Sequence, residues 1–188
     1  MSNQDGPQQP DPRIDLLINP GAYATGLAVI HSQEEFMLDF INGIAAPPIV
    51  AARIVVTSLQ LKRILRVLWE NIRLYEEAFG AIPAMSAKAS SKNTNAGDLY
   101  AQLYVPDELL GGRYSNTMTS RYTRDVFILD FMTKFPPHAK IVARLLISTQ
   151  QIRSISGAIE DNIAQYEKRY SKIEEAKSTD QPPGFSLN

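Results

Sequence analysis

The chain contains no cysteine, so neither a disulfide framework nor a thiolate metal site can form. It also lacks any run approaching the roughly 18 apolar residues that a membrane-spanning helix needs. The N-terminus is rich in Gln, Pro and Asp and has neither the basic nor the apolar region of a secretory signal. The formal net charge is only −1, which gives no general attraction to nucleic acid or anionic membranes. We therefore expect a cytoplasmic protein with no membrane partner.

The most informative feature that is present is an internal repeat. Residues 23–76 align without a gap to residues 114–167, an offset of 91 positions. Of these 54 positions 13 are identical, against about three expected by chance from ordinary residue usage. The element Phe36-x-Leu38-Asp39-Phe40 returns as Phe127-x-Leu129-Asp130-Phe131, and Tyr75-Glu76 returns as Tyr166-Glu167. The chain therefore consists of two copies of one structural unit.

Each copy changes its hydrophobic period once. Residues 25–32, 36–41 and 50–57 are apolar or β-branched at strand length, and the second of these runs alternates strictly. After Ser58 the period becomes helical until Gly80, with one apolar stripe at Leu61, Ile64, Leu65, Leu68, Ile72 and Tyr75. Each unit is therefore predicted to be β-β-β-α, an α+β fold with antiparallel strands and the helix on the outer face.

A three-stranded sheet with one helix covers one face, and its second face needs a partner. In the first copy that face carries Met37, Ile41 and Val55, and in the second copy Ile128, Met132 and Leu146. We expect these two faces to meet, by edges or by faces, in a pseudo-dimer about a two-fold axis.

Composition divides the chain into five parts. Residues 1–13 are predicted to be a disordered tail, 14–80 the first repeat, 81–98 a linker, 99–171 the second repeat and 172–188 a flexible tail.

The first helix carries extra apolar residues outside its main stripe, namely Leu59, Val67, Trp69 and Leu74, where the second helix has mostly polar or small ones. An exposed Trp flanked by aliphatic residues is a candidate partner interface. Alternatively, these residues cover the linker or the segment 99–110.

Two pairs of charges fall inside predicted strands. Asp39 and Arg53 lie in neighbouring strands on the face away from the helix, and Asp130 and Arg144 repeat this arrangement. Because a lone charge is costly to bury, we interpret both pairs as structural cross-strand ion pairs in preference to a ligand site.

Familiar catalytic motifs are missing. There is no Gly-x-Gly-x-x-Gly, P-loop or nucleophile elbow. The two histidines, His31 and His138, correspond to Tyr122 and Pro47 in the other copy, so neither belongs to a repeated metal or general-base site. We expect no enzyme activity, no cofactor, no metal and no small-molecule substrate.

The repeated residues resemble a known family. An acidic-Phe-x-Leu-Asp-Phe strand and a helix ending in Tyr-Glu are similar to the bacterial family catalogued as domain of unknown function 3467. Tyr114-Ser115-Asn116 matches the Tyr-x-Asn start of that family, whereas Thr25 replaces the Asn in the first copy. The resemblance implies no catalytic residues, because the family has none assigned.

Three functions remain open. The first is a non-catalytic protein-interaction or assembly module, binding a protein partner or forming a homo-oligomer through the Trp69 surface or exposed sheet edges. The second is a holdase-like chaperone, suggested by a similarity in element order to SecB. The third is nucleic-acid binding through Arg63, Arg66 and Arg73 on the first helix, although pairing with Glu70 would make the same stripe an ordinary solvated face.

Overall fold

The structure is a computed structural model that describes residues 21–83, 96–136 and 138–174. The predicted tail 1–13, most of the predicted linker and the end of the predicted C-terminal tail lie outside the described residues. Within the described residues, no helix is both long and apolar enough to cross a bilayer.

The first half of the chain folds into four strands and a long helix. The strands are β1 (Ala22–Ala24), β2 (Gly26–His31), β3 (Glu35–Asn42) and β4 (Ile49–Thr57), and the helix is α2 (Ser58–Phe79). Thr57 caps the start of α2, where its side-chain hydroxyl accepts a hydrogen bond from the Gln60 amide. Gly80 ends the helix at a φ of +88°, a left-handed value that suits glycine.

The second half repeats this order after a short non-repetitive segment. That segment contains α3 (Ala96–Tyr100) and the 3₁₀ turn η1 (Asp107–Leu109). The strands β5 (Arg113–Tyr114), β6 (Thr117–Tyr122), β7 (Val126–Phe135) and β8 (His138–Ser148) follow, and α4 (Thr149–Arg169) completes the described elements.

The strands form two four-stranded sheets, and each sheet takes one strand from the other half of the chain. The first sheet has the order β2-β3-β4-β5, and the second has the order β1-β8-β7-β6. The exchanged strands β1 and β5 pair in parallel with β8 and β4, whereas the other pairs are antiparallel. The expectation of three antiparallel strands per unit therefore missed a fourth, parallel strand in each sheet. With three and two residues, these strands are too short to show alternation.

One core joins both sheets and both helices. The buried side of the first sheet carries Phe36, Leu38 and Phe40, and Phe40 lies 5.5 Å from Phe131 of the second sheet between ring centroids. The faces that meet are therefore the helix-facing ones. The expectation that the opposite faces pack together was wrong for the described residues, since the six residues of that prediction are half-buried and outside this core: Met37, Ile41, Val55, Ile128, Met132 and Leu146.

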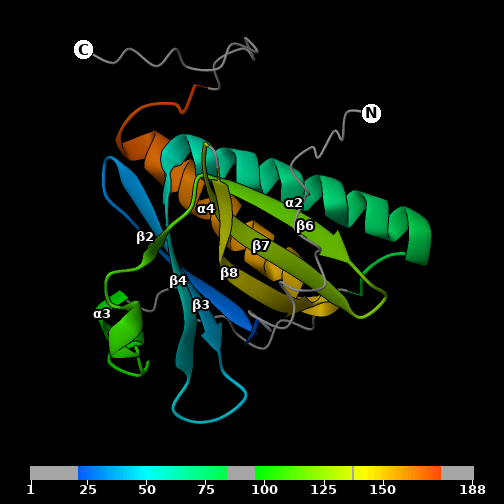
Figure 1. The fold of residues 1–188 in the computed structure, drawn as a ribbon, viewed down its shortest axis with the longest axis horizontal. Coiled ribbons are helices and arrows are strands. Elements are labelled where there is room, and N and C mark those ends of the chain that lie inside the picture. The colour runs from blue at the N-terminus through cyan, green and yellow to red at the C-terminus, as the bar shows by residue number, and fades with distance from the viewer. Residues whose placement is uncertain (1–20, 84–95, 137, 175–188) are drawn as a thin grey trace, which may run out of the picture.

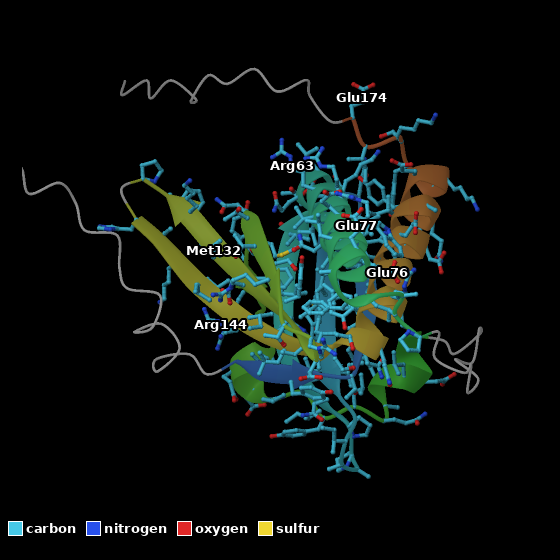
Figure 2. All side chains as sticks on the ribbon, turned by 90° about the vertical axis from the view of Figure 1, so that its right-hand side faces the viewer. Arg63, Glu76, Glu77, Met132, Arg144 and Glu174 are labelled. Carbon is cyan, nitrogen blue, oxygen red and sulfur yellow. The ribbon has the colours of Figure 1, made fainter. Side chains whose placement is uncertain are left out.

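The two helices lie side by side and close one side of this core (Figure 1). They contact each other, so they do not lie on separate outer faces. Lys62 of α2 pairs with Glu167 of α4 at 3.1 Å, and Arg153 of α4 pairs with Glu76 of α2 at 2.6 Å. Glu76 accordingly points toward α4 (Figure 2).

Candidate functional site

The outer face of the first sheet, which is the face away from the helices, holds a buried ion pair. Asp39 and Arg53 stand opposite each other in the β3–β4 register. Arg53 donates from Nε to Asp39 Oδ1 at 2.7 Å and from Nη2 to Oδ2 at 2.8 Å. Asp39 is fully buried, and the hydrogen bond to its carboxylate raises the pKa of Arg53. The two side chains thus form a bidentate ion pair in the middle of the sheet.

Residues 97–110, which we call the covering segment, lie against this ion pair. The Tyr100 hydroxyl donates a short hydrogen bond to Asp39 Oδ2, and Arg53 Nη1 donates to the Leu110 carbonyl at 3.2 Å. Burial and the bond to Asp39 raise the pKa of Tyr100, so its hydroxyl stays protonated as a donor. The covering segment therefore binds the outer face through one side chain and one backbone carbonyl.

The covering segment is also attached along the edge of β4. The Val50 amide donates to the Tyr104 carbonyl, and the Tyr104 amide donates to the Pro48 carbonyl, each at 2.9 Å. Leu109 is buried, whereas Tyr104 and Leu110 are more than half exposed. The segment is consequently held by backbone pairing, a buried leucine and the ion pair together.

The outer face of the second sheet contains the equivalent ion pair with different surroundings. Arg144 donates from Nε to Asp130 Oδ1 at 2.5 Å and from Nη2 to Oδ2 at 3.0 Å. Arg121 of β6 adds a third donor, with Nη2 at 2.7 Å from Asp130 Oδ2. Arg121 thus donates to the same carboxylate oxygen that Tyr100 contacts in the first sheet, but its side chain is 49% exposed.

Two glycines bring the chain into the exchanged strands in the same way. Gly21 and Gly112, which are 91 positions apart, both have positive φ, at +90° and +66°. A β-carbon on Gly21 would lie 3.0 Å from Cγ of Arg144, and one on Gly112 would lie 3.3 Å from Cγ of Arg53. Each glycine therefore lets the backbone pass close over the arginine of an ion pair.

This geometry favours holding a ligand segment over acid–base chemistry. Asp39 and Asp130 each accept hydrogen bonds from three donor groups, which occupy most of the acceptor sites of each carboxylate. Among the described residues, no group of three His, Cys, Asp or Glu side chains is arranged to hold a metal ion.

The residues of the candidate partner interface lie on α2, mostly half-buried. Leu59, Val67 and Trp69 pack against the core, and Leu74 is 37% exposed. Trp69 is thus not the exposed tryptophan that the hypothesis assumed, and Leu74 is the most accessible of the four.

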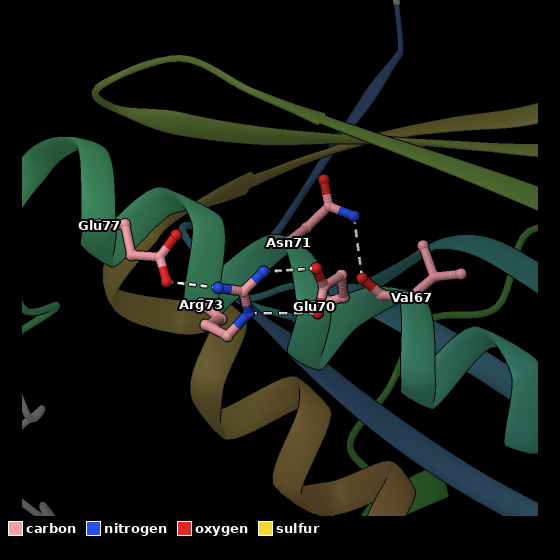
Figure 3. A network of polar contacts seen from close by, with 5 residues as sticks. All are labelled: Val67, Glu70, Asn71, Arg73 and Glu77. Atoms are coloured by element: carbon pink, nitrogen blue, oxygen red, sulfur yellow. Dashed lines mark hydrogen bonds and ion pairs between the residues drawn. The ribbon is translucent and has the colours of Figure 1, made fainter.

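The basic stripe of α2 is partly neutralised by its neighbours. Arg73 donates to Glu70 and to Glu77 on the same helix (Figure 3). The pairing raises the pKa of Arg73 and lowers that of Glu70. Arg63 and Arg66 are exposed on the same helix.

The two histidines lie in unrelated places. The ring of His31 packs among Phe36, Tyr166 and Tyr170, with centroid distances of 5.1 to 6.1 Å. His138 is exposed at the start of β8. Neither takes part in the ion-pair sites.

Sequence reasoning missed the covering segment and the role of Tyr100. The segment has no regular period, and the composition of residues 81–98 predicts a linker, so the sequence does not indicate that the adjoining residues lie on a sheet. The sequence does contain one signal for the exchanged strands β1 and β5. Gly21-x-Tyr23 recurs as Gly112-x-Tyr114, which shows that the repeat begins earlier than residue 23.

One comparison with known proteins supports the duplication. No curated protein and no solved structure matches the chain. The family described as Protein of unknown function (DUF3467) matches twice, at residues 1–84 and 85–175. The resemblance seen in the sequence is confirmed: the chain belongs to this family and carries two copies of its domain.

Proposed function

We propose that the chain is a non-catalytic protein-interaction module that binds an extended polypeptide segment on the outer face of a β-sheet. The observation that carries this proposal is the covering segment on the first sheet. Its contacts use a hydroxyl against Asp39, a carbonyl against Arg53 and a buried leucine. A buried carboxylate–guanidinium pair offers an acceptor and a donor to a passing chain, which is a chemically general way to grip a polypeptide.

We further propose that the two halves are related as a pseudo-dimer by a pseudo-two-fold axis. Support comes from contacts that recur between the halves at the offset of 91. Lys62–Glu167 corresponds to Arg153–Glu76, and the exchanged strands β1 and β5 are added to opposite sheets. An arrangement of this kind has two related outer faces, one for each Asp–Arg pair, and the covering segment lies on the first of them.

The chaperone and nucleic-acid-binding functions would each give a different experimental result. A holdase would suppress aggregation of a chemically unfolded model protein at substoichiometric concentration, and it would show no preference among peptide sequences. Nucleic-acid binding would appear as a salt-dependent shift of single-stranded DNA or RNA. We propose the segment-binding role in the cytoplasm, either toward a separate partner or between copies of the chain.

A peptide library displayed on phage and selected on the immobilised full chain tests the proposal. Selected peptides should lose at least tenfold in affinity when Val55→Asp or Leu146→Asp alters the outer face of the first or second sheet. The matched control is Leu74→Asp on α2, which should leave affinity unchanged. Circular dichroism of each variant establishes that the fold is retained. If no peptide is selected, or if Leu74→Asp alone abolishes binding, the outer-face proposal is wrong.

A further inference from the structure

We propose that residues 13–19 of the chain itself occupy the outer face of the second sheet, as the covering segment occupies that of the first. These residues precede the described part of the chain. The inference rests on the proposed function and names the segment that the second face holds. It starts from the burial of the second ion pair.

The two ion pairs are buried to the same extent. Asp130 and Arg144 are 4% and 3% exposed, against 0% and 7% for Asp39 and Arg53. On the first face the covering segment lies over the pair and forms hydrogen bonds with both of its members. Equal burial on the second face therefore indicates a cover of similar extent there.

The chain enters the second face directly above its ion pair. A β-carbon on Gly21 would lie 3.0 Å from Cγ of Arg144. Asn19 is two residues earlier, and two residues span at most about 7 Å. On the first face the Leu110 carbonyl accepts from Arg53 two residues before the glycine that corresponds to Gly21. The backbone at residue 19 is therefore within reach of the arginine in the same chain.

The sequence before Gly21 corresponds to the second half of the covering segment. At the offset of 91, residues 13–19 align with residues 104–110, and both lie inside a match to the family domain. Two apolar positions recur, Leu109 as Ile18 and Val105 as Ile14. The hydrogen bonds of residues 104–110 to β4 and to Arg53 use backbone amides and carbonyls, so they do not depend on which side chains stand there. Residues 13–19 can therefore make the same set of contacts.

The side-chain contact of the covering segment has its own substitute on the second face. Tyr100 corresponds to Gln9, which has no phenol. Arg121 donates to the oxygen of Asp130 that is equivalent to the one Tyr100 contacts on Asp39. The position of Arg121 is an isoleucine in the first sheet. Each carboxylate therefore has one additional donor, and the second face needs none from its covering residues.

Occupancy by the same chain would regulate access to this face. A segment held by a short connection has an effective concentration on the order of millimolar. A separate partner then binds the second face only by displacing residues 13–19.

Hydrogen exchange of the intact chain, followed by mass spectrometry, tests the occupancy. Residues 13–19 should exchange at least tenfold more slowly than residues 2–5, with residues 104–110 as the protected reference. Leu146→Asp, on the outer face of the second sheet, should abolish the protection of residues 13–19. Leu74→Asp on α2 is the matched control and should leave it unchanged. Free exchange of residues 13–19 in the wild type would overturn the inference.

Deletion of residues 1–19 gives a second, independent test. A fluorescent peptide with the sequence of residues 6–19 should bind the shortened chain at least tenfold more tightly than the full-length chain, because the face is then vacant. Leu146→Asp in the shortened chain should abolish this gain, and Val55→Asp on the first face should preserve it. Circular dichroism establishes that the shortened chain is folded. If it is not, the exchange experiment on the full-length chain decides.

Other results would contradict the inference in distinguishable ways. Equal affinity of the peptide for both chains would overturn it, and loss of the gain with Val55→Asp alone would assign the peptide to the first face. A full-length dimer that becomes a monomer on deletion, as seen by light scattering, would assign residues 13–19 to a second copy. If library peptides bind while residues 13–19 exchange freely, the inference fails and the proposed function stands. If residues 13–19 are protected but no library peptide binds either chain, the proposed function fails and the occupancy remains as an internal contact.

Discussion

Tyr75 and Tyr166, which are 91 residues apart, make the same hydrogen bond in opposite directions across the molecule. The Tyr75 hydroxyl donates to the carbonyl of Arg124 in the β6–β7 turn, and the Tyr166 hydroxyl donates to the carbonyl of Gln33 in the β2–β3 turn, both at 2.7 Å. Each helix thus anchors the hairpin of the other half. Both tyrosines also contact aromatic rings there, Tyr75 with Phe127 and Tyr166 with Phe36.

Removing either hydroxyl should cost the same amount of stability. Tyr75→Phe and Tyr166→Phe each delete one largely buried hydrogen bond and keep the ring, so we expect each to lower the free energy of unfolding by about 1 kcal/mol. Urea denaturation followed by circular dichroism measures this. Tyr104→Phe, on an exposed ring, is the control and should change the midpoint little. Clearly unequal losses for the two variants would mean that the halves do not share these contacts equally.

Stability should fall on acidification partly through Glu76 and Glu167. The hydrogen bond from Arg153 and that from the Ile82 amide lower the pKa of Glu76, while the Ile173 amide and Lys62 lower that of Glu167. A carboxylate whose pKa is depressed in the folded state stabilises the fold above its unfolded pKa, and this contribution disappears as the pH falls through the folded pKa. The loss should therefore develop below about pH 4.5.

The matched experiment compares urea midpoints of Glu76→Gln and the wild type between pH 7 and pH 3. The variant should be less stable at neutral pH and should lose less stability on acidification. Arg153→Gln should reproduce most of this flattening, and the double variant should show little further change, because the two side chains act as one pair. Parallel pH curves for the wild type and Glu76→Gln would rule out this carboxylate as a contributor.

Breaking a buried ion pair should be far more costly than these surface effects. Arg53→Met leaves Asp39 buried with only the Tyr100 hydroxyl as a side-chain donor, and we expect a loss of about 3–5 kcal/mol. The double variant Asp39→Leu, Arg53→Met removes both charges and should recover part of that loss. Chemical denaturation of the single and double variants measures the difference. A double variant less stable than Arg53→Met would show that the pair itself, and not the uncompensated charge, supplies the stability.

Periodicity predicts part of this fold well. The helical stripe of Leu61, Ile64, Leu68 and Ile72 is buried, because spacings of three and four residues put one side of a helix on the core. The same reasoning puts Asp39 and Arg53 on one sheet face. It gives no information on partner choice between sheets, since strand alternation is the same whichever sheet a strand joins.

The contacts of the covering segment could not be predicted in the same way. Tyr100 reaches Asp39 across 61 positions from a five-residue helix, and nothing in the local sequence of either residue implies that contact. The error about which faces meet has a related cause. Alternation shows that both faces of β3 are apolar, but a half-buried face under a covering segment and a fully buried face have similar residue patterns.

Gly111 and Gly112 are neighbours whose substitution should have opposite consequences. Gly112→Ala places a β-carbon 2.8 Å from Cγ2 of Val55 at a left-handed φ, so it should destabilise the protein by more than about 1 kcal/mol. Gly111→Ala meets open space at an ordinary φ and should be neutral or stabilise by up to about 1 kcal/mol. Thermal denaturation of both variants measures the contrast. Equal midpoints would mean that the close passage over Arg53 imposes no restraint.

Cutting the chain between its two family domains should not separate the halves. A protease site inserted after residue 84 produces two fragments, but β1 remains paired with β8 of the other fragment and β5 with β4. Since the fragments also share one core, they should elute together in size-exclusion chromatography under native conditions. After cutting, the urea midpoint should rise with protein concentration, because unfolding then includes dissociation. The uncut insertion variant is the control, with a midpoint independent of concentration. Separate elution of the fragments in native buffer would contradict the exchanged-strand architecture. Each fragment would then remain folded although its sheet had lost the strand that the other half supplies.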